Sequence, residues 1–132
     1  MTITELTQKC YELAKEKGFW DKERNFAEMI ALTHSELSEC LEGHRKGFTI
    51  LREGEKPTSI EIEADKEMII GEYKSKDLIG YKDIKDCYEL ELADAIIRIL
   101  DICGGLNIPI EKLILAKLEY NKNRPYKHGK QY

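Results

Sequence analysis

The sequence predicts an all-α protein built as a four-helix bundle. Apolar residues recur every three or four positions over four long segments, and glycine or proline punctuates the ends of these segments. The chain has 132 residues, of which 42% are hydrophobic, so it is long enough to bury one core. We therefore predict a single helical domain over residues 1–132.

The first two helices are predicted over residues 3–17 and about 21–46. Apolar positions repeat at helical spacing along both segments. Thr4 is the expected N-cap of the first helix, and Gly18 is expected to end it. Gly47 is expected to end the second helix in the same way.

The third and fourth helices are predicted over about residues 82–103 and 107–123. The glycine pair 104–105 is interpreted as the stop signal of the third helix. Pro109 suits the first turn of the fourth helix, and Pro125 prevents its continuation.

Residues 48–82 break this helical pattern. They contain three glycines and one proline, and acidic and apolar residues alternate over a short stretch. We interpret this segment as an irregular insert between the second and third helices.

Charged residues make up 35% of the chain, with 21 Lys and Arg against 25 Asp and Glu for a net charge of −4. This acidic balance argues against a protein that binds duplex DNA, so no nucleic-acid partner is expected. No apolar run approaches the length of a membrane span, so no membrane partner is expected either. The 4 cysteines form no CxxC pair, and free thiols in a reducing cytoplasm are the expected state.

Two pairs of acids lie on the predicted helices at a spacing of three residues. Glu36 and Glu39 belong to the second helix, and Glu91 and Asp94 belong to the third. Residues three apart lie one turn along the same side of a helix, so both acids of a pair can reach one ion. Apolar residues flank these acids, and a carboxylate among apolar residues is costly unless it is paired or bound to a cation. Four oxygen ligands without Cys or His suit a hard cation, Mg²⁺ or Mn²⁺.

An ion pair is the alternative role for these acids. Arg98 follows Asp94 by four residues and lies between Glu91 and Asp94 on the helical wheel, so it can neutralise them on the helix surface. A di-iron site of the ferritin-like kind is not expected. It needs a Glu-x-x-His pair, and here the third position after each Glu is another acid.

The C-terminal segment is basic. Residues 117–132 carry a net charge of +4, so the rest of the chain carries −8. Arginine and lysine side chains bind phosphate oxygens well, and a basic face beside a metal suits a polyphosphate ligand. The alternative is a solvated basic tail. The candidates for phosphate binding are Lys117, Asn121 and Arg124, which share one helix face, and then Lys127 and Lys130.

Together these motifs resemble the MazG-like all-α nucleoside triphosphate pyrophosphatases, a superfamily that includes the dimeric all-α dUTPases and dCTPases. The resemblance covers about residues 20–47 and 83–130. One departure is the long separation between the two pairs of acids, where the simplest members have a short linker. The motifs are Glu36-x-x-Glu39, Glu91-Leu-Ala-Asp94, Lys117, Asn121-x-x-Arg124-Pro125 and Lys127-His128-Gly129-Lys130.

The resemblance implies an enzyme, a hydrolase that cleaves a nucleoside triphosphate between its α and β phosphates and releases pyrophosphate. Such an enzyme serves in nucleotide-pool house-cleaning. Glu36, Glu39, Glu91 and Asp94 would hold one to three Mg²⁺ ions, with Mn²⁺ as a substitute. Glu36 or Glu39 would be the general base. The five C-terminal candidates would bind phosphate or sugar.

The resemblance also implies a homodimer or a homotetramer, because the active sites of the family form between helices that pair across subunits. The third predicted helix is apolar around more than half its circumference, which agrees with such pairing. Trp20 and His34 are candidate contacts for the nucleobase of the substrate, with packing as their preferred role. Two other functions stay open: a non-catalytic helical interaction module, and a nucleotide sensor that binds without hydrolysis.

Overall fold

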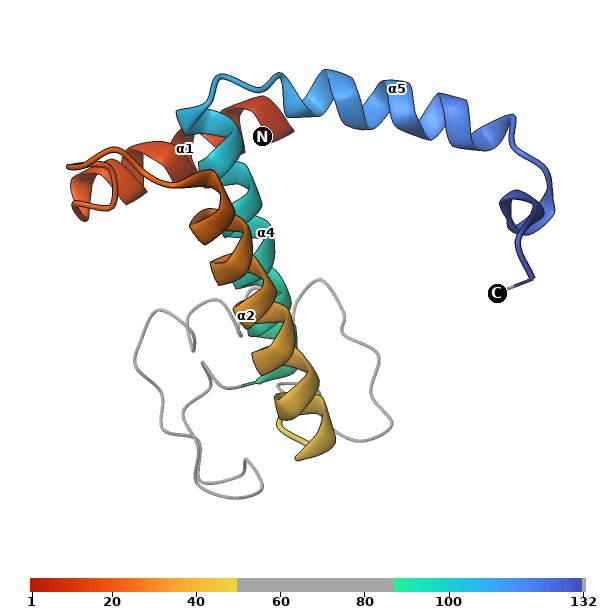
Figure 1. Cartoon of the computed structure of the whole chain (residues 1–132), viewed down its shortest axis with the longest axis horizontal. Coiled ribbons are helices and arrows are strands. Elements are labelled where there is room, and N and C mark those ends of the chain that lie inside the picture. The colour runs from red at the N-terminus through yellow and green to blue at the C-terminus, as the bar shows by residue number, and fades with distance from the viewer. Residues whose placement is uncertain (50–86, 132) are drawn as a thin grey trace. The chain divides into compact units, whose positions relative to one another are not determined.

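The computed structural model describes residues 1–49 and 87–131. Within these ranges the chain forms α-helices and one short 3-10 helix, without a strand, so the all-α prediction is confirmed there. The predicted insert lies outside the described residues, apart from its first two positions. The elements are α1 (Ile3–Glu16), α2 (Phe26–Arg45), α4 (Tyr88–Gly105), α5 (Ile110–Lys122) and the 3-10 helix η2 (Tyr126–Gly129) (Figure 1).

α1 begins earlier than its predicted cap. Thr2, not Thr4, is the N-cap, and it forms a capping box with Glu5. The Glu5 amide donates to Thr2 Oγ1 at 3.1 Å, and the Thr2 amide donates to Glu5 Oε2 at 2.6 Å. The Thr4 amide instead donates to Glu111 Oε2 at 2.8 Å, so Thr4 links α1 to α5.

α2 begins five residues later than predicted, at Phe26. Asn25 is the N-cap, and its side-chain oxygen accepts a hydrogen bond from the Glu28 amide at 3.2 Å. Asparagine is among the strongest N-cap residues, so it sets the start of the helix. The preceding residues form a turn, in which the Asp21 amide donates to the Gly18 carbonyl at 3.2 Å.

Three helices end in the same way, in a Schellman motif. In each, one residue takes a left-handed conformation, and the amide of the next residue donates to the carbonyl five positions earlier at 2.8–3.0 Å. The predictions of Gly18 and Gly47 as stop residues are confirmed. The left-handed residues are Gly18 (φ 83°), Gly47 (φ 71°) and Asn107 (φ 54°).

α4 ends at Gly105, where the glycine pair 104–105 was predicted to stop it, but neither glycine is the left-handed residue that closes the helix. Both residues belong to the last turn of α4, and the helix closes at Asn107. Their role is close packing. A Cβ atom on Gly104 would lie 2.6 Å from Tyr11 Cβ, and one on Gly105 would lie 2.1 Å from the Trp20 ring.

The chain divides into two compact units. The terminal unit comprises Met1–Glu23 and Ile99–Tyr132, and the central unit comprises Arg24–Arg98. α4 passes from the central unit into the terminal unit. The predictions of a single domain and of a four-helix bundle stay predictions.

In the terminal unit, the last turns of α4 pack against α1 and the segment that follows it. The Tyr11 and Trp20 rings meet edge to face, with 5.4 Å between their centroids. Trp20 Nε1 donates to Asp101 Oδ1 at 2.7 Å, which satisfies a buried acid. All four cysteines are free thiols, as expected, and burial raises the pKa of Cys10 and Cys103 within this unit.

In the central unit, α2 and the first part of α4 run side by side in opposite directions (Figure 1). At one end the Tyr88 amide donates to the Phe48 carbonyl at 3.1 Å, and the rings of His44 and Tyr88 meet edge to face. At the other end Arg98 forms an ion pair with Glu36. These contacts set which side chains of α2 face α4.

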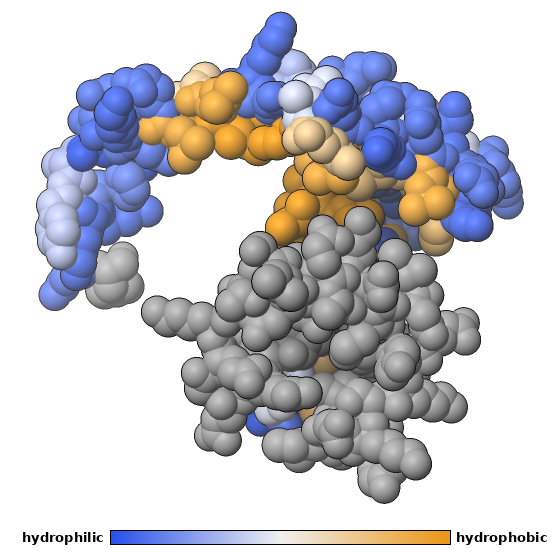
Figure 2. Space-filling view, turned by 180° about the vertical axis from the view of Figure 1, so that it is seen from behind, coloured by the Kyte–Doolittle hydropathy of each residue, from blue (hydrophilic) through white to orange (hydrophobic). Residues whose placement is uncertain are grey.

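Many large apolar side chains among the described residues are exposed. α5 contains no buried residue, and Leu115 and Leu118 are 60% and 59% exposed. Figure 2 shows hydrophobic residues gathered along this helix. No described helix is both long and apolar enough to cross a membrane.

Candidate metal centre

Three of the four predicted metal ligands lie together in the central unit. Carboxylate oxygens of Glu36, Glu91 and Asp94 all lie within 4.8 Å of one another. Glu36 comes from α2, and the other two lie one turn apart on α4. The antiparallel pairing of these helices therefore brings one acid of α2 and two acids of α4 together, although they lie far apart in the sequence. We call these three residues the acidic cluster.

Burial distinguishes the members of the acidic cluster. Glu36 and Glu91 are only 7% and 6% exposed, whereas Asp94 is exposed. Buried carboxylates are stable only when cations or hydrogen-bond donors compensate their charge. The oxygen-only donor set fits a hard divalent cation.

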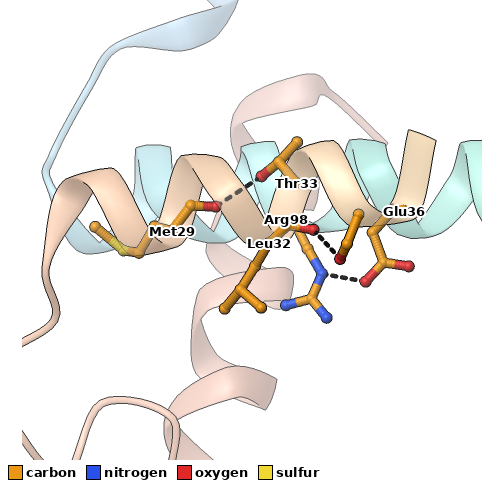
Figure 3. A network of polar contacts seen from close by, with 6 residues as sticks. Met29, Leu32, Thr33, Glu36 and Arg98 are labelled. Carbon is orange, nitrogen blue, oxygen red and sulfur yellow. Dashed lines mark hydrogen bonds and ion pairs between the residues drawn. The ribbon is translucent and has the colours of Figure 1, made fainter. Parts of the chain in front are cut away.

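Arg98 compensates part of this charge. Its Nε donates to Glu36 Oε1 across the two helices, and the terminal guanidinium nitrogens point away from Glu36 (Figure 3). The sequence places Arg98 beside Glu91 and Asp94 on its own helix and gives no indication of Glu36, which depends on the facing helix.

Asp94 shows the electrostatic cost of the cluster. Partial burial of its carboxyl raises its pKa, and the nearby negative charge of Glu36 raises that pKa further. The positive charge of Arg98 acts in the opposite direction. A second cation near these oxygens would favour the ionised form of Asp94.

The hydroxyl groups of Thr33 and Ser35, near Glu36 on α2, donate to backbone carbonyls and not to the carboxylates of the acidic cluster. Thr33 Oγ1 donates to the Met29 carbonyl at 3.0 Å, and Ser35 Oγ donates to the Leu32 carbonyl at 2.8 Å (Figure 3). Such bonds back to the preceding turn satisfy the hydroxyls inside the helix.

Glu39, the fourth predicted ligand, lies outside this group of three. It follows Glu36 by nearly one turn of α2 and is exposed. Its assignments as a metal ligand and as a general base stay predictions.

The predicted phosphate ligands lie in the terminal unit. Lys117 Nζ lies 4.5 Å from the centroid of the Tyr120 ring, and the Arg124 guanidinium lies 5.8 Å from the same centroid. These two cations therefore flank one aromatic ring. Arg124 lies just beyond the end of α5 at Lys122, so the predicted helix face does not extend to it. Lys127 Nζ lies 5.9 Å from the Tyr126 centroid, and Lys130 is exposed.

Asn121 has the same helical spacing and one unusual feature. Its Oδ1 is buried and finds no hydrogen-bond donor in the part of the chain that the structure describes. Buried side-chain acceptors are normally paired, so this oxygen retains capacity for a donor. Its assignment to substrate stays a prediction.

The two candidate contacts for the nucleobase differ in their surroundings. Trp20 is packed on Gly105 and hydrogen-bonded to Asp101, which agrees with a packing role. His34 is exposed on α2, so a packing role within this chain is not supported.

Comparisons with known protein families, with curated proteins and with solved structures give no match. The resemblance to the MazG-like family therefore rests on its sequence motifs, and the activity that it implies is a proposal.

Proposed function

We propose that this protein is a cytoplasmic, Mg²⁺-dependent nucleoside triphosphate pyrophosphohydrolase, which cleaves a (d)NTP into the (d)NMP and pyrophosphate. The observation that carries the proposal is the acidic cluster, in which two helices bring three carboxylates within 4.8 Å. Two of these three carboxylates are buried, and a donor set made only of oxygen suits Mg²⁺ or Mn²⁺.

In the proposed reaction, Glu36, Glu91 and Asp94 hold the cation. When bound, a divalent cation neutralises phosphate oxygens and lowers the pKa of a coordinated water. Glu39 is exposed beside the cluster on α2, so it is the carboxylate assigned to accept the proton of the attacking water. Glu36 is already committed to the cluster, which leaves Glu39 as the better general base of the two.

The C-terminal residues are assigned to the substrate's phosphates and sugar. Lys117 and Arg124 both approach the ring of Tyr120, which supports a common role. Asn121 lies between them and offers an acceptor oxygen without a described donor. Lys127 and Lys130 extend this positive charge along the chain.

The test measures pyrophosphate release from a panel of dNTPs and NTPs with Mg²⁺. Wild type is expected to release pyrophosphate from at least one nucleotide. Glu36→Gln and Glu91→Gln should lower kcat by about 100-fold or more, since each removes a proposed charged ligand. Glu28→Gln is the matched control, because Glu28 is an exposed acid on α2, two turns before Glu36, and should keep wild-type activity.

A non-catalytic protein with the same fold is the second candidate, and the ion pair between Arg98 and Glu36 favours it. An interaction module predicts no turnover with any nucleotide and no thermal shift with Mg²⁺. A nucleotide sensor predicts Mg²⁺-dependent nucleotide binding without release of pyrophosphate. Either pattern would exclude the hydrolase.

We also propose that the protein assembles as a homodimer or a homotetramer. The exposed leucines of α5 support this proposal, because a helix without buried residues gains little from its own chain. Light scattering after size exclusion should give a mass of two or four chains for wild type. Leu115→Glu should shift the mass toward one chain, whereas Lys112→Glu, an exposed position on the same helix, should not. A monomeric wild type would contradict the assembly.

A further inference from the structure

Arg98 reaches the acidic cluster from α4 and holds a carboxylate of the opposite helix. The side chain of Glu36 is only 10% exposed, and that of Arg98 is 34% exposed. Arg98 uses Nε for this contact, and Glu36 is its one hydrogen-bond partner among the described residues. The rest of the guanidinium points away from Glu36 (Figure 3).

The charge of Arg98 is permanent. A guanidinium keeps its proton in proteins, so Arg98 cannot become neutral when its surroundings change. A divalent cation on the oxygens of Glu36 would lie within a few ångströms of this guanidinium, and the two positive charges would repel each other. Arg98 and the divalent cation therefore compete for one carboxylate.

The geometry allows Arg98 to leave. Glu36 is fixed by burial between two helices, whereas a third of the Arg98 side chain is already in contact with solvent. Rotation of a long, partly exposed side chain costs little compared with movement of a buried one. The arginine is therefore the partner that moves when the pair opens.

We propose that Arg98 is an internal counter-ion of the metal-free protein, which holds Glu36 until a divalent cation displaces it. This inference rests on the proposed metal site and adds a regulatory property to it. The pair stabilises the metal-free protein, and it raises the concentration of cation needed to fill the site. Arg98 thus opposes metal binding, whereas a residue that merely positions Glu36 would support it.

The test measures binding of Mg²⁺ alone and Mn²⁺ alone to the full chain by calorimetry. Arg98→Gln removes the charge and should lower the Kd of both cations by about tenfold, because the competing charge is lost. Arg98→Lys keeps the charge and should stay within about threefold of wild type. In EDTA, Arg98→Gln should have a lower Tm than wild type, since it leaves Glu36 unpaired.

Arg45→Gln is the matched control. Arg45 lies on α2, is exposed, and is nine residues from Glu36, about 13.5 Å along the helix axis. This variant makes the same change in net charge and should leave both Kd values unchanged. An equal decrease in Kd for Arg45→Gln and Arg98→Gln would overturn the proposal, because the effect would then reflect net charge alone.

A second measurement uses the wild-type protein, so it does not depend on the folding of a variant. The Nε–Hε signal of Arg98 in ¹⁵N-edited NMR is expected to move toward the position of a solvated arginine as Mg²⁺ fills the site. An unchanged signal at saturating Mg²⁺ would show that the pair persists and would overturn the proposal. An unchanged or higher Kd for Arg98→Gln would do the same.

Failure of the metal site itself has a different result. If neither wild type nor Arg98→Gln binds Mg²⁺ or Mn²⁺, the proposed function fails and the counter-ion proposal fails with it. If wild type binds the cation and releases pyrophosphate but Arg98→Gln does not bind more tightly, only the role of Arg98 is wrong.

Discussion

Ionisation of Asp94 is unfavourable in the metal-free protein. Its carboxyl is partly desolvated and lies near the negative charge of Glu36, so its pKa is raised in the folded state. A carboxyl with a raised pKa stabilises the fold below its unfolded-state pKa, and this contribution is lost as the pH rises through the folded-state pKa. At neutral pH the ionised Asp94 therefore weakens the metal-free fold.

We predict that Asp94→Asn raises the Tm of the protein in EDTA at pH 7 by roughly 1–3 °C, a small effect because Asp94 is exposed and screened. The difference from wild type should shrink as the pH falls and Asp94 becomes protonated. With saturating Mg²⁺ the order should reverse, because only wild type keeps all three carboxylates of the cluster. Thermal scans at several pH values check this, and a lower Tm for Asp94→Asn in EDTA would contradict it.

The acidic cluster also shows what could be predicted residue by residue. The spacing of Glu91 and Asp94 on one helix was sufficient to place both side chains on one side. The choice of Glu36 over Glu39 was not predictable, because it depends on the rotation of α2 against α4. The pairing of Arg98 with Glu36 has the same origin, since helical periodicity describes a helix's own neighbours only.

At the scale of elements, helix ends were predicted better than helix beginnings. Gly18 and Gly47 end their helices because glycine adopts positive φ without a steric cost. The beginnings were displaced because several residues near each start can cap a helix, and Thr2 and Asn25 are the ones that do. Glycine is needed at positions 104 and 105 for a different reason, because the side chains of Tyr11 and Trp20 pack closely against them.

This contact between Gly105 and Trp20 makes a prediction about α4. Alanine normally stabilises a helix by about 1 kcal/mol relative to glycine. Here a Cβ would lie 2.1 Å from the Trp20 ring, which is held by Asp101 and Tyr11, so overpacking outweighs this gain. Gly105→Ala should lower the free energy of unfolding by about 1–3 kcal/mol and alter the tryptophan fluorescence.

A double-mutant cycle isolates the cause. In a Trp20→Leu background the ring is absent, so Gly105→Ala should become neutral or stabilising by up to about 1 kcal/mol. Denaturation in urea measures both steps. A stabilising effect of Gly105→Ala in the wild-type background would show that Trp20 moves aside at little cost.

At the scale of the whole molecule, composition concealed the distribution of charge. A net charge of −4 combines an acidic body with a C-terminal segment of +4. The structure places the acidic cluster in the central unit and the basic segment in the terminal unit. The all-α class followed from periodicity alone, whereas assembly depends on contacts beyond a single chain, which periodicity does not encode.

Two arginines, one in each unit, have different proposed roles. Arg124 is proposed to bind the nucleotide, and Arg98 is proposed to compete with the cation for Glu36. Arg124→Ala should raise the Kd for a nucleotide by about tenfold or more, the usual effect of losing a charge-assisted hydrogen bond. It should leave the Kd for Mg²⁺ alone unchanged.

Arg98→Ala should show the reverse pattern, with tighter binding of Mg²⁺ alone and a much smaller effect on the nucleotide at saturating Mg²⁺. Lys122→Ala is the control for lost positive charge near Arg124, since Lys122 is exposed and pairs with Glu119 at 3.6 Å. Calorimetry with a non-hydrolysable triphosphate, and with Mg²⁺ alone, separates the two equilibria. Equal losses of nucleotide affinity for Arg98→Ala and Arg124→Ala would contradict the assignment of the phosphates to Arg124, because Arg98 is not proposed to contact the nucleotide.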